Sequence, residues 1–306
     1  MKYEKLKQLS PLLRQAISFQ PITSGFSGDR TFLVTTSSEK LVLKLSDIRK
    51  YASLKRKASV LQKLKDRGVL CSEVMEIGMS AEQSCTFRIF PFIEGENARA
   101  SIHRLTNEEQ YEIGRRAGRD LSLIHTYHAP AHEAPWGEKV MAKHERYIHA
   151  YQSSGVAFSH DQFVLDFIQS HADAVKGRPH QFQHDDFHLG NILLQGNQYA
   201  GVIDFDQSDF GDPIHDFYKL SLFSREISIP FSAGQVDHYL SKQGINDFWL
   251  LFSIYTAMSC FSSIVWTLSY DPGHVKDMVN RVDRILKDHK RFTQLQPVWY
   301  ADWHHL

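Results

Sequence analysis

Short runs of alternating apolar and polar residues occupy the first ninety positions of the chain. The segment KLVLKLS (40–46) alternates as a strand with one buried face does, and two extended runs flank a Gly/Ser turn within 21–36. Residues 51–68 instead place leucine and alanine at helical spacing and end at a glycine. A further strand at 86–96 is interrupted by proline and glycine. The pattern predicts a small strand-rich lobe with one helix, bounded near 86–96.

Helical spacing dominates after that boundary. Within 105–125, Thr106 and Glu109 have the spacing of a capping box, and apolar residues then follow one helical face. Gly114 and Gly118 lie four residues apart, so we expect another backbone to approach this helix closely there. A larger helical lobe therefore follows the first, with further helical segments expected at 138–152 and 160–175.

One apolar stretch, FWLLFSIYTAMSCFSSIVWTL (248–268), requires a membrane test. It carries no charged residue and exceeds the roughly 20 residues that span a bilayer. It also contains six serine or threonine residues and lacks a flanking Lys/Arg cluster. We expect a buried helix of a soluble protein and no membrane association.

Composition and charge exclude several classes of function. The 306 residues include 35 basic and 35 acidic residues, so the net charge gives no general attraction to nucleic acid or to anionic membranes. Cys71, Cys85 and Cys260 are widely spaced and read as reduced thiols, which favours a cytoplasmic protein. The N-terminal residues lack an apolar signal region, so secretion is not expected. Oligomeric state stays open.

The segment HQFQHDDFHLGNILL (180–194) concentrates histidines and aspartates immediately before an apolar strand. His184, Asp186 and Asn191 fit the pattern H-x-D-x-x-x-x-N. A kinase-type catalytic loop needs a carboxylate that receives a hydroxyl proton, followed by an amide oxygen that holds a cation near the phosphates. The spacing therefore predicts a phosphotransfer loop, in which His184 is a packed histidine that braces the backbone.

A second carboxylate follows about a dozen residues later. Asp204 closes the apolar strand of YAGVIDFD, and a turn at 195–201 would bring it beside Asn191. Two oxygen ligands from neighbouring strands suit Mg²⁺, whose remaining ligands are substrate phosphates and water. Together, the loop and this strand predict a magnesium-dependent phosphotransfer site.

The strand-rich lobe offers weaker signals for phosphate binding. Gly25, Ser27 and Gly28 lie in a turn whose backbone N–H groups could approach phosphate oxygens, although an ordinary hairpin has the same composition. Lys44 lies between two leucines on the next strand, where it either points to solvent or places a charge on nucleotide phosphates.

The motifs HDDFHLGN, VIDFD and GDPIHDF, in this order, resemble those of the aminoglycoside phosphotransferase family, whose fold is similar to that of eukaryotic protein kinases. The resemblance covers nearly the whole chain and implies an α+β, bilobal fold: an antiparallel N-lobe over 1–92, a hinge near 90–96, and a mainly helical C-lobe over 97–306. It implies Asp186 as the catalytic base and Asn191 and Asp204 as Mg²⁺ ligands. The nucleotide-binding positions implied for ATP or GTP are Gly25, Ser27, Gly28, Lys44, Phe90, Phe92 and Ile93.

Some positions of the family pattern have a structural meaning, and two positions depart from it. Asp212 and Asp216 match structural positions, and Asp212 is expected to cap a helix that begins at the following proline. Asp185 stands where the family has glycine, and it would raise the pKa of its neighbour if both carboxylates pointed inward. Lys57 stands where the family has a glutamate that pairs with the strand lysine. The partner of that lysine is then missing, is Asp47, or comes from elsewhere.

Three other functions are alternatives to a small-molecule kinase. A metal hydrolase would use His184, Asp185 and His188, but the glycine and strand that follow argue against a helical zinc pair. A non-catalytic nucleotide-binding module is supported only by the missing glutamate. A protein kinase would carry H-R-D, D-F-G and A-P-E segments, and the sequence has none of them.

The acceptor is expected to be a small hydroxylated molecule, with an aminoglycoside-type antibiotic first and a macrolide, choline, homoserine or a sugar as alternatives. A polycation would need an acidic pocket, for which the available residues are Asp206, Asp209, Glu226, Asp237 and Asp271. A more apolar substrate could instead contact aromatic residues, although Trp249 and Trp266 are expected in the core. The C-terminal PVWYADWHHL (297–306) either closes over the substrate or docks on the lobe.

Overall fold

The computed structural model describes residues 3–23, 28–130, 133–243 and 247–305. The chain forms two compact units. The first, here called the N-terminal unit, consists of Met1–Gly95 and Ala200–Asp206, and the second, the C-terminal unit, of Glu96–Tyr199 and Gln207–Leu306. The short segment 200–206 therefore belongs with the first ninety-five residues, although it follows them by about a hundred positions.

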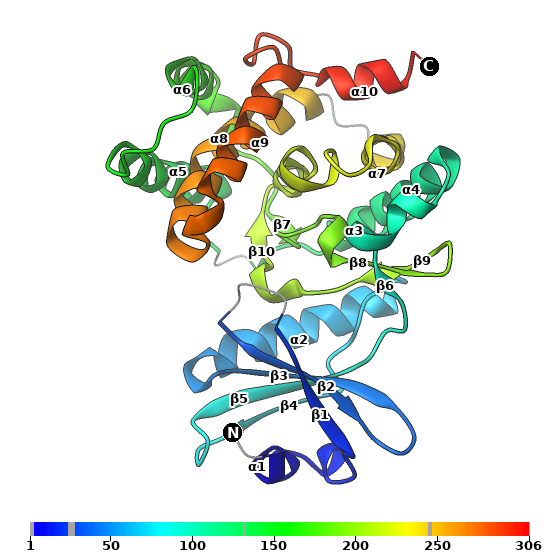
Figure 1. Cartoon of the computed structure of the whole chain (residues 1–306). Coiled ribbons are helices and arrows are strands. Elements are labelled where there is room, and N and C mark those ends of the chain that lie inside the picture. Colours follow the sequence, from blue (N-terminus) through cyan, green and yellow to red (C-terminus); the bar gives the residue numbers. More distant parts are fainter. Residues whose placement is uncertain (1–2, 24–27, 131–132, 244–246, 306) are drawn as a thin grey trace. The chain divides into compact units, whose positions relative to one another are not determined.

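The N-terminal unit is built on a five-stranded antiparallel sheet in the order β1-β2-β3-β5-β4. Helix α2 (Tyr51–Asp66) lies across one face of this sheet (Figure 1). The predicted strand at 40–46 and the predicted helix at 51–68 are confirmed. The remaining elements are β1 (Ser18–Ile22), β2 (Arg30–Thr35), β3 (Lys40–Asp47), β4 (Glu76–Ser80), β5 (Cys85–Pro91), α1 (Tyr3–Lys7), η1 (Pro11–Leu13) and η2 (Ile48–Lys50).

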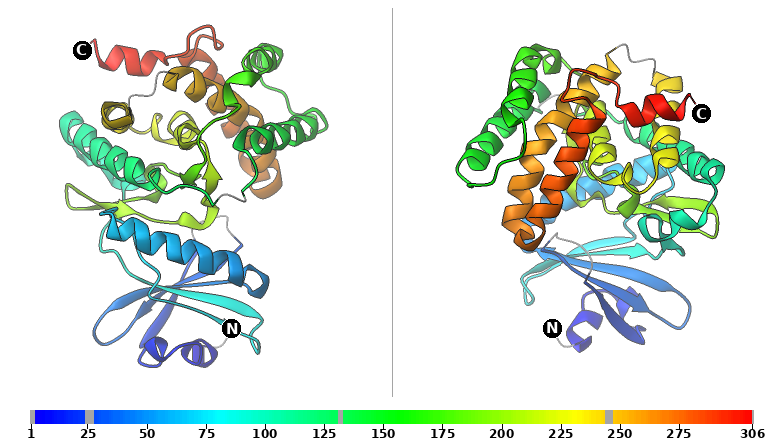
Figure 2. Two further views of the ribbon diagram at one scale, coloured as in Figure 1. Left: turned by 180° about the vertical axis from the view of Figure 1, so that it is seen from behind. Right: turned by 45° about the horizontal axis from the view of Figure 1, so that its top comes forward.

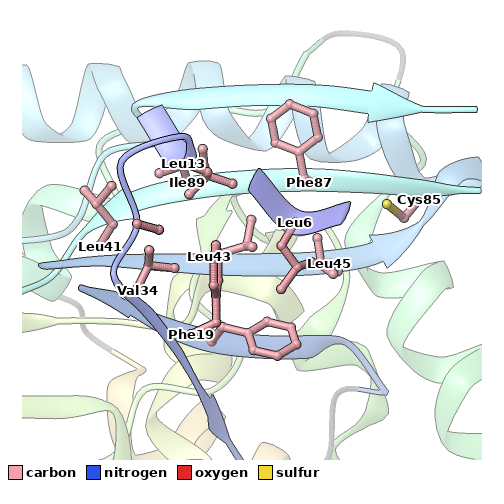
Figure 3. Close-up of a cluster of buried hydrophobic side chains, with 12 residues drawn as sticks. Leu6, Leu13, Phe19, Val34, Leu41, Leu43, Leu45, Cys85, Phe87 and Ile89 are labelled. Carbon is pink, nitrogen blue, oxygen red and sulfur yellow. The ribbon is translucent and has the colours of Figure 1, made fainter. Parts of the chain in front are cut away.

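Alternation along β3 separates the two faces of the sheet. Leu41, Leu43 and Leu45 are almost fully buried and pack in one apolar cluster with side chains of β5 and of the N-terminal segment (Figure 3). Because successive side chains of a strand point to opposite faces, the residues between these leucines lie on the other face. Lys44 is one of them, so the core packing of β3 fixes the side of the sheet on which its ammonium group is found.

The C-terminal unit is mainly helical. Helices α8 and α9 run side by side and α5 packs beside α8 (Figures 1 and 2). Two small sheets, in the orders β6-β8-β9 and β10-β7, carry the loops of the candidate site. The helices are α3 (Ala98–Ser101), α4 (Asn107–Ile124), α5 (Trp136–Gln152), α6 (Asp161–Ser170), α7 (Ile229–Gln243), α8 (Phe248–Tyr270), α9 (Val275–Asp288) and α10 (Val298–Trp303). The strands are β6 (Glu96–Asn97), β7 (Gln181–Gln183), β8 (Ile192–Gln195), β9 (Gln198–Val202) and β10 (Asp209–Gly211), of which β9 begins in this unit and continues into residues 200–206 of the N-terminal unit.

Short helical turns connect these elements. They are η3 (Ile102–Arg104), η4 (Ala172–Val175), η5 (Leu189–Asn191), η6 (Phe205–Gln207), η7 (Pro213–Phe217), the π-type turn η8 (Leu220–Ser224) and η9 (Pro272–His274).

Helix α4 confirms two predictions made from its sequence. Thr106 and Glu109 form the reciprocal capping box, with the Glu109 N–H donating to the Thr106 hydroxyl over 3.2 Å. A Cβ atom on Gly114 would lie 2.0 Å from the carbonyl oxygen of Phe231 in α7, and one on Gly118 would lie 2.4 Å from that of Gln235. The two glycines therefore allow α4 and α7 to pack backbone to backbone, which no larger residue would permit.

Helix α8 corresponds to the apolar stretch that raised the membrane question. It is long and apolar enough to cross a bilayer, but 78% of its most apolar window is buried within the protein. This matches the expected core helix, because a helix that is apolar all round is buried in a large protein as well as in a membrane. The expectation that Trp266 is a core residue is wrong, since its side chain near the end of α8 is 36% exposed. All three cysteines are free and buried.

Candidate active site

The buried carboxylate of Asp216 fixes the backbone of the loop between β7 and β8. This carboxylate is fully buried and accepts hydrogen bonds from the backbone N–H groups of His184 (2.9 Å) and Asp185 (2.6 Å). His125 lies 3.0 Å from the same carboxylate. A carboxylate that accepts two backbone donors fixes the path of the loop, which agrees with the structural role that the family resemblance implied for Asp216.

Asp212 has a similar structural role at the next turn. Its side chain accepts from the N–H of Ile214 and caps η7, which begins at Pro213 as predicted. The same buried carboxylate accepts from Arg178 (2.7 Å) and from the hydroxyl of Tyr255 (2.8 Å). The capping prediction is therefore confirmed, with a short helical turn in place of a longer helix.

Asp186, the predicted catalytic base, is contacted on three sides within the C-terminal unit. Its Oδ1 lies 2.8 Å from Nζ of Lys219 and 3.4 Å from Nε2 of His188. Its Oδ2 accepts from Nδ2 of Asn191 over 2.9 Å. Burial favours the neutral acid, but the nearby charge of Lys219 and the contact with His188 outweigh it, so the pKa of Asp186 lies well below its usual range. The carboxylate is therefore an oriented anion at neutral pH.

The neighbouring Asp185 points to different partners. Its carboxylate lies 3.2 Å from Nδ1 of His215 and 4.0 Å from Nζ of Lys143. Burial acts to raise the pKa of Asp185, but the contacts with His215 and Lys143 hold it below its ordinary value. The alternative in which Asp185 raises the pKa of Asp186 is therefore wrong. A left-handed backbone at Asp185 (φ +59°), uncommon for a residue other than glycine, accompanies the divergence of the two side chains.

His184 supports the loop from inside. Its side chain is fully buried, its Nδ1 accepts from the N–H of Asp186 over 3.2 Å, and its ring meets that of Phe187 edge to face. These contacts agree with the predicted bracing histidine. Across the described ranges, no three or more His, Cys, Asp or Glu side chains cluster as metal ligands, and the loop is not a helix, so the hydrolase alternative lacks its site.

In the N-terminal unit, Lys44 forms two close ion pairs. Its Nζ lies 2.7 Å from Oδ1 of Asp204 and 2.8 Å from Oδ2 of Asp206. Burial acts to lower the pKa of Lys44, yet these two carboxylates raise it above its ordinary value. The partner of Lys44 therefore comes from elsewhere in the chain. The alternative that Asp47 serves as this partner is wrong, because Asp47 caps η2 and pairs with Arg49.

Arg88 explains why Asp206 occupies this position. In the pairing of β3 with β5, Arg88 lies directly opposite Lys44, so two cations meet on one face of the sheet. Like charges placed directly opposite each other destabilise a sheet. Asp206 binds both, with its Oδ1 2.5 Å from Arg88, and Asp29 contacts Arg88 on the other side at 3.1 Å. With Arg88 5% and Asp206 12% exposed, the pairs are shielded from water.

Lys57 contributes to the same cluster from helix α2. Its Nζ donates to the backbone carbonyl of Asp206 over 2.6 Å. A lysine at this position therefore holds the main chain beside the carboxylate that binds Lys44. In the family pattern, a glutamate at this position binds the strand lysine directly. Here the helix residue is instead a cation, and it binds the main chain of Asp206, whose carboxylate pairs with the strand lysine.

The other predicted nucleotide-binding positions are only partly described. Gly25 and Ser27 lie outside the described residues. Gly28 has a left-handed backbone (φ +41°) and open space around it, a conformation that favours glycine. Phe90 is the last residue but one of β5, and the guanidinium of Arg88 lies 5.7 Å from its ring centre. The N–H of Phe92 donates to the carbonyl of Lys40 over 3.1 Å. Ile93 follows in the half-buried segment that leaves the sheet.

The predicted magnesium ligands fit that ion by their chemistry. Asn191 supplies an amide oxygen, since its Nδ2 already donates to Asp186, and Asp204 supplies a carboxylate that is 38% exposed beside Lys44. Oxygen ligands of this kind suit Mg²⁺ when phosphates and water complete the shell. β8 and β9 are neighbours in one sheet, as the predicted turn requires. The two ligands belong to different units, so their joint action stays a prediction.

The acidic residues considered for a polycationic substrate already have partners in the structure. Asp237 accepts from the hydroxyls of Tyr111 (2.8 Å) and Tyr300 (2.5 Å), and His304 lies 3.1 Å away. These contacts attach α10 to α4 and α7, so docking is the correct alternative for the C-terminal segment. The other pairs are Asp206 with Lys44 and Arg88, Asp209 with Lys139, Glu226 with Arg281 and Arg284, and Asp271 with His274.

These loops, strands and ion pairs define a kinase-like phosphotransferase, and comparison with known proteins agrees. Residues 18–248 match the model of the phosphotransferase enzyme family. The chain belongs to this family, and the expected α+β kinase-like fold is confirmed. No curated protein matches the chain.

Solved structures with the same fold include several aminoglycoside phosphotransferases. The gentamicin complex of APH(2″)-IIa is 18% identical, covers 92% of this chain and 95% of its own, and has a TM-score of 0.64. APH(4)-Ia with ADP and hygromycin B is 14% identical, with coverages of 93% and 97% and a TM-score of 0.68. The GDP complex of aminoglycoside 2′-phosphotransferase-IIIa is 12% identical, with coverages of 90% and 93% and a TM-score of 0.69.

Sequence reasoning missed Arg88 and Lys219, and it considered Asp206 for an acidic substrate pocket and not as the partner of Lys44 and Arg88. The available signal for Arg88 was its position among apolar residues of β5. An arginine that pairs with Lys44 across two strands indicates a shared anion, which here is Asp206. Lys219 follows the GDPIHDF motif by two residues, but nothing in the spacing indicates which carboxylate it binds.

Proposed function

We propose that the protein transfers the γ-phosphoryl group of ATP or GTP to a hydroxyl group of a small molecule in an Mg²⁺-dependent reaction. The observation that carries this proposal is the state of Asp186: an anionic carboxylate in the H-x-D-x-x-x-x-N loop, held by Lys219, His188 and Asn191. Family membership and the kinase-like fold support the same reaction class.

In this reaction the bond from the γ-phosphorus to its bridging oxygen breaks, a bond to the acceptor oxygen forms, and the nucleoside diphosphate leaves. Asp186 accepts a hydrogen bond from the acceptor hydroxyl and takes its proton as the ester forms. Because its low pKa makes Asp186 a weak base, its main contribution is to orient the hydroxyl, as a loose transition state requires. Lys219 adds a positive charge beside the reacting hydroxyl.

In the N-terminal unit, Lys44 is the residue proposed to bind nucleotide phosphates. Its two carboxylate partners keep it charged and restrict its position. Bound Mg²⁺ would neutralise phosphate charge, with Asn191 and Asp204 as its protein ligands. The backbone near Phe90, Phe92 and Ile93 is the proposed contact for the nucleotide base.

Aminoglycoside-type antibiotics are the first acceptors to test, because two of the structural neighbours bind gentamicin and hygromycin B. Macrolides, choline, homoserine and sugars form the second group. We also propose a cytoplasmic location, which the three buried free thiols and the burial of α8 support.

The test is phosphate transfer from γ-labelled ATP and GTP to this panel, with and without Mg²⁺. Asp186→Ala should lose transfer by about 10²- to 10⁴-fold and retain nucleotide binding. Asp173→Ala is the matched control, because that carboxylate is exposed and lies on η4. Transfer by Asp186→Ala at the normal rate would overturn the assignment of the loop. Tight nucleotide binding without transfer to any acceptor would favour a non-catalytic module.

A further inference from the structure

Two hollows that share Lys143 and Tyr147 as wall residues lie in the C-terminal unit. The smaller has a volume of about 40 Å³ and the larger about 260 Å³, so together they approach the size of a small-molecule site. Helices α5 and α8 and the segment around η7 supply the walls. All wall residues belong to one unit, so the hollows do not depend on the N-terminal unit.

These hollows lead to the catalytic loop through two wall residues. Lys143 lies 4.0 Å from the carboxylate of Asp185. Tyr218 precedes Lys219, whose ammonium lies 5.1 Å from the Tyr218 ring centre and 2.8 Å from Asp186. A molecule that occupies the smaller hollow therefore adjoins the residues that flank the proposed base.

The wall charges have one sign. Lys143 and Arg146 line the hollows, and their walls contain no aspartate or glutamate among the described residues. The carboxylate that contacts the wall is Asp185, which lies 3.2 Å from Nδ1 of His215 and 4.0 Å from Nζ of Lys143. A polyamine would meet the like charges of Lys143 and Arg146 here, whereas an anionic group would find a charge partner.

The wall surface between these charges includes three tyrosines beside aliphatic and serine side chains. Tyr147, Tyr218 and Tyr255 contribute rings, and the hydroxyl of Tyr255 is fixed by Asp212. Rigid aromatic walls favour flat apolar groups, which pack against them by stacking or edge contact.

His144 adds an unsatisfied polar group to the smaller hollow. It is 8% exposed, and its Nδ1 has no hydrogen-bond partner in the described part of the chain. Burial lowers the pKa of His144 to about 4, so the ring is neutral at pH 7. Buried polar atoms of native proteins nearly always have partners, so this nitrogen is available to a polar atom of a molecule that enters the hollow.

We infer that the two hollows form the acceptor site, and that this site takes a hydroxylated compound with a flat ring and an anionic group such as a carboxylate. The inference rests on the proposed phosphotransfer, and it places an anionic acceptor ahead of the polycationic antibiotics that the structural neighbours bind. Lys143 and Arg146 bind the anionic group, the tyrosines contact the ring, and His144 hydrogen-bonds a polar substituent.

Direct binding tests this inference without relying on turnover. The probes are 4-(hydroxymethyl)benzoate, its uncharged methyl ester and gentamicin, and saturation-transfer NMR with the full chain gives each dissociation constant. We expect the acid to bind about tenfold more tightly than the ester, and gentamicin to bind most weakly at this site. Arg146→Glu should remove the preference for the acid, and because Arg146 is exposed this variant should fold normally. Lys143→Gln is the second variant.

Lys242→Glu serves as the control, since this exposed lysine lies on α7 away from the hollows. Equal affinity for acid and ester, or an unchanged preference in Arg146→Glu, would overturn the inference. Tighter binding of gentamicin than of the acid would also overturn it. A preference for the acid without phosphate transfer to any acceptor would instead support the site and count against the proposed phosphotransfer.

Discussion

Acid should destabilise the C-terminal unit through His289, which lies at the end of α9. Its side chain is fully buried, its ring stacks on Phe292 at 5.0 Å, and its Nδ1 lies 3.2 Å from the carbonyl oxygen of Gln294. Its Nε2 has no hydrogen-bond partner in the described part of the chain. Protonation would therefore place a charge without a partner in an apolar environment, and burial lowers the pKa of His289 to about 4.

The size of the effect follows from linkage between folding and protonation. In the unfolded chain the imidazole has a pKa near 6.5, so below that pH the unfolded state binds a proton that the folded state does not. Stability is therefore unaffected above pH 6.5 and falls as the pH decreases toward 4. Each pH unit within this window costs about 1.4 kcal/mol, and the full loss from His289 is about 3 kcal/mol.

Urea unfolding between pH 7.5 and 4.5 measures this loss. All five tryptophans lie in the C-terminal unit, so their fluorescence reports on the unit that contains His289. In His289→Asn the amide can replace the Nδ1 donor but cannot be protonated in this range. Between pH 7.5 and 4.5, the free energy of unfolding of the variant should therefore fall by about 2 to 3 kcal/mol less than that of the wild type.

The comparison between wild type and variant isolates this residue, because burial also lowers the pKa of His144 and both proteins retain that group. His305→Asn provides a control at an exposed position, and it should have the wild-type pH dependence. Parallel stability curves for the wild type and His289→Asn would refute the reasoning.

Two further predictions concern helix packing and catalysis. Gly118→Ala should reduce the free energy of unfolding by about 2 kcal/mol or more, because the new Cβ would lie 2.4 Å from a carbonyl oxygen of α7. Gly273→Ala is the control, because the space around Gly273 is open. In the same urea assay it should change the free energy of unfolding by less than about 1 kcal/mol. Lys219→Met should reduce kcat by about 10²-fold and raise the pKa of Asp186, so that an acidic limb moves to higher pH in the rate profile. Lys242→Met, at an exposed site, should leave kcat and the acidic limb of the rate profile unchanged. If Lys219→Met had the wild-type pH–rate profile, Lys219 would not set the charge state of Asp186.

Local pattern predicted the elements of this fold well, because local physics determines them. Alternation along 40–46 reflects a strand with one buried face, and the capping box at Thr106 satisfies backbone donors within a single turn. The glycine pair in α4 was also interpretable, since only a close backbone contact explains two missing side chains one turn apart. Trp266 shows the limit of this reasoning, because residue type alone does not determine which face of a long helix is covered.

The candidate site was predictable where its residues are close in sequence. Asp186 and Asn191 lie five positions apart, and their side chains hydrogen-bond as parts of one loop. The partners of Lys44 were not predictable, since Asp206 is 162 positions away and its placement depends on how β3, β5 and the segment 200–206 pack together. For the same reason, the sequence indicated a second carboxylate at Asp185 but not its contacts with His215 and Lys143, which lie on the side away from Asp186.

The cluster around Lys44 has a consequence for control of the enzyme. In protein kinases, displacement of one helix breaks the ion pair between its glutamate and the strand lysine, which switches activity off. Here both carboxylates that hold Lys44 come from residues 204–206, and Lys57 of α2 contacts the main-chain carbonyl of Asp206. The charge partners of Lys44 therefore do not belong to α2. Displacement of α2 is consequently not expected to act on Lys44 by breaking an ion pair between helix and strand, as it does in protein kinases.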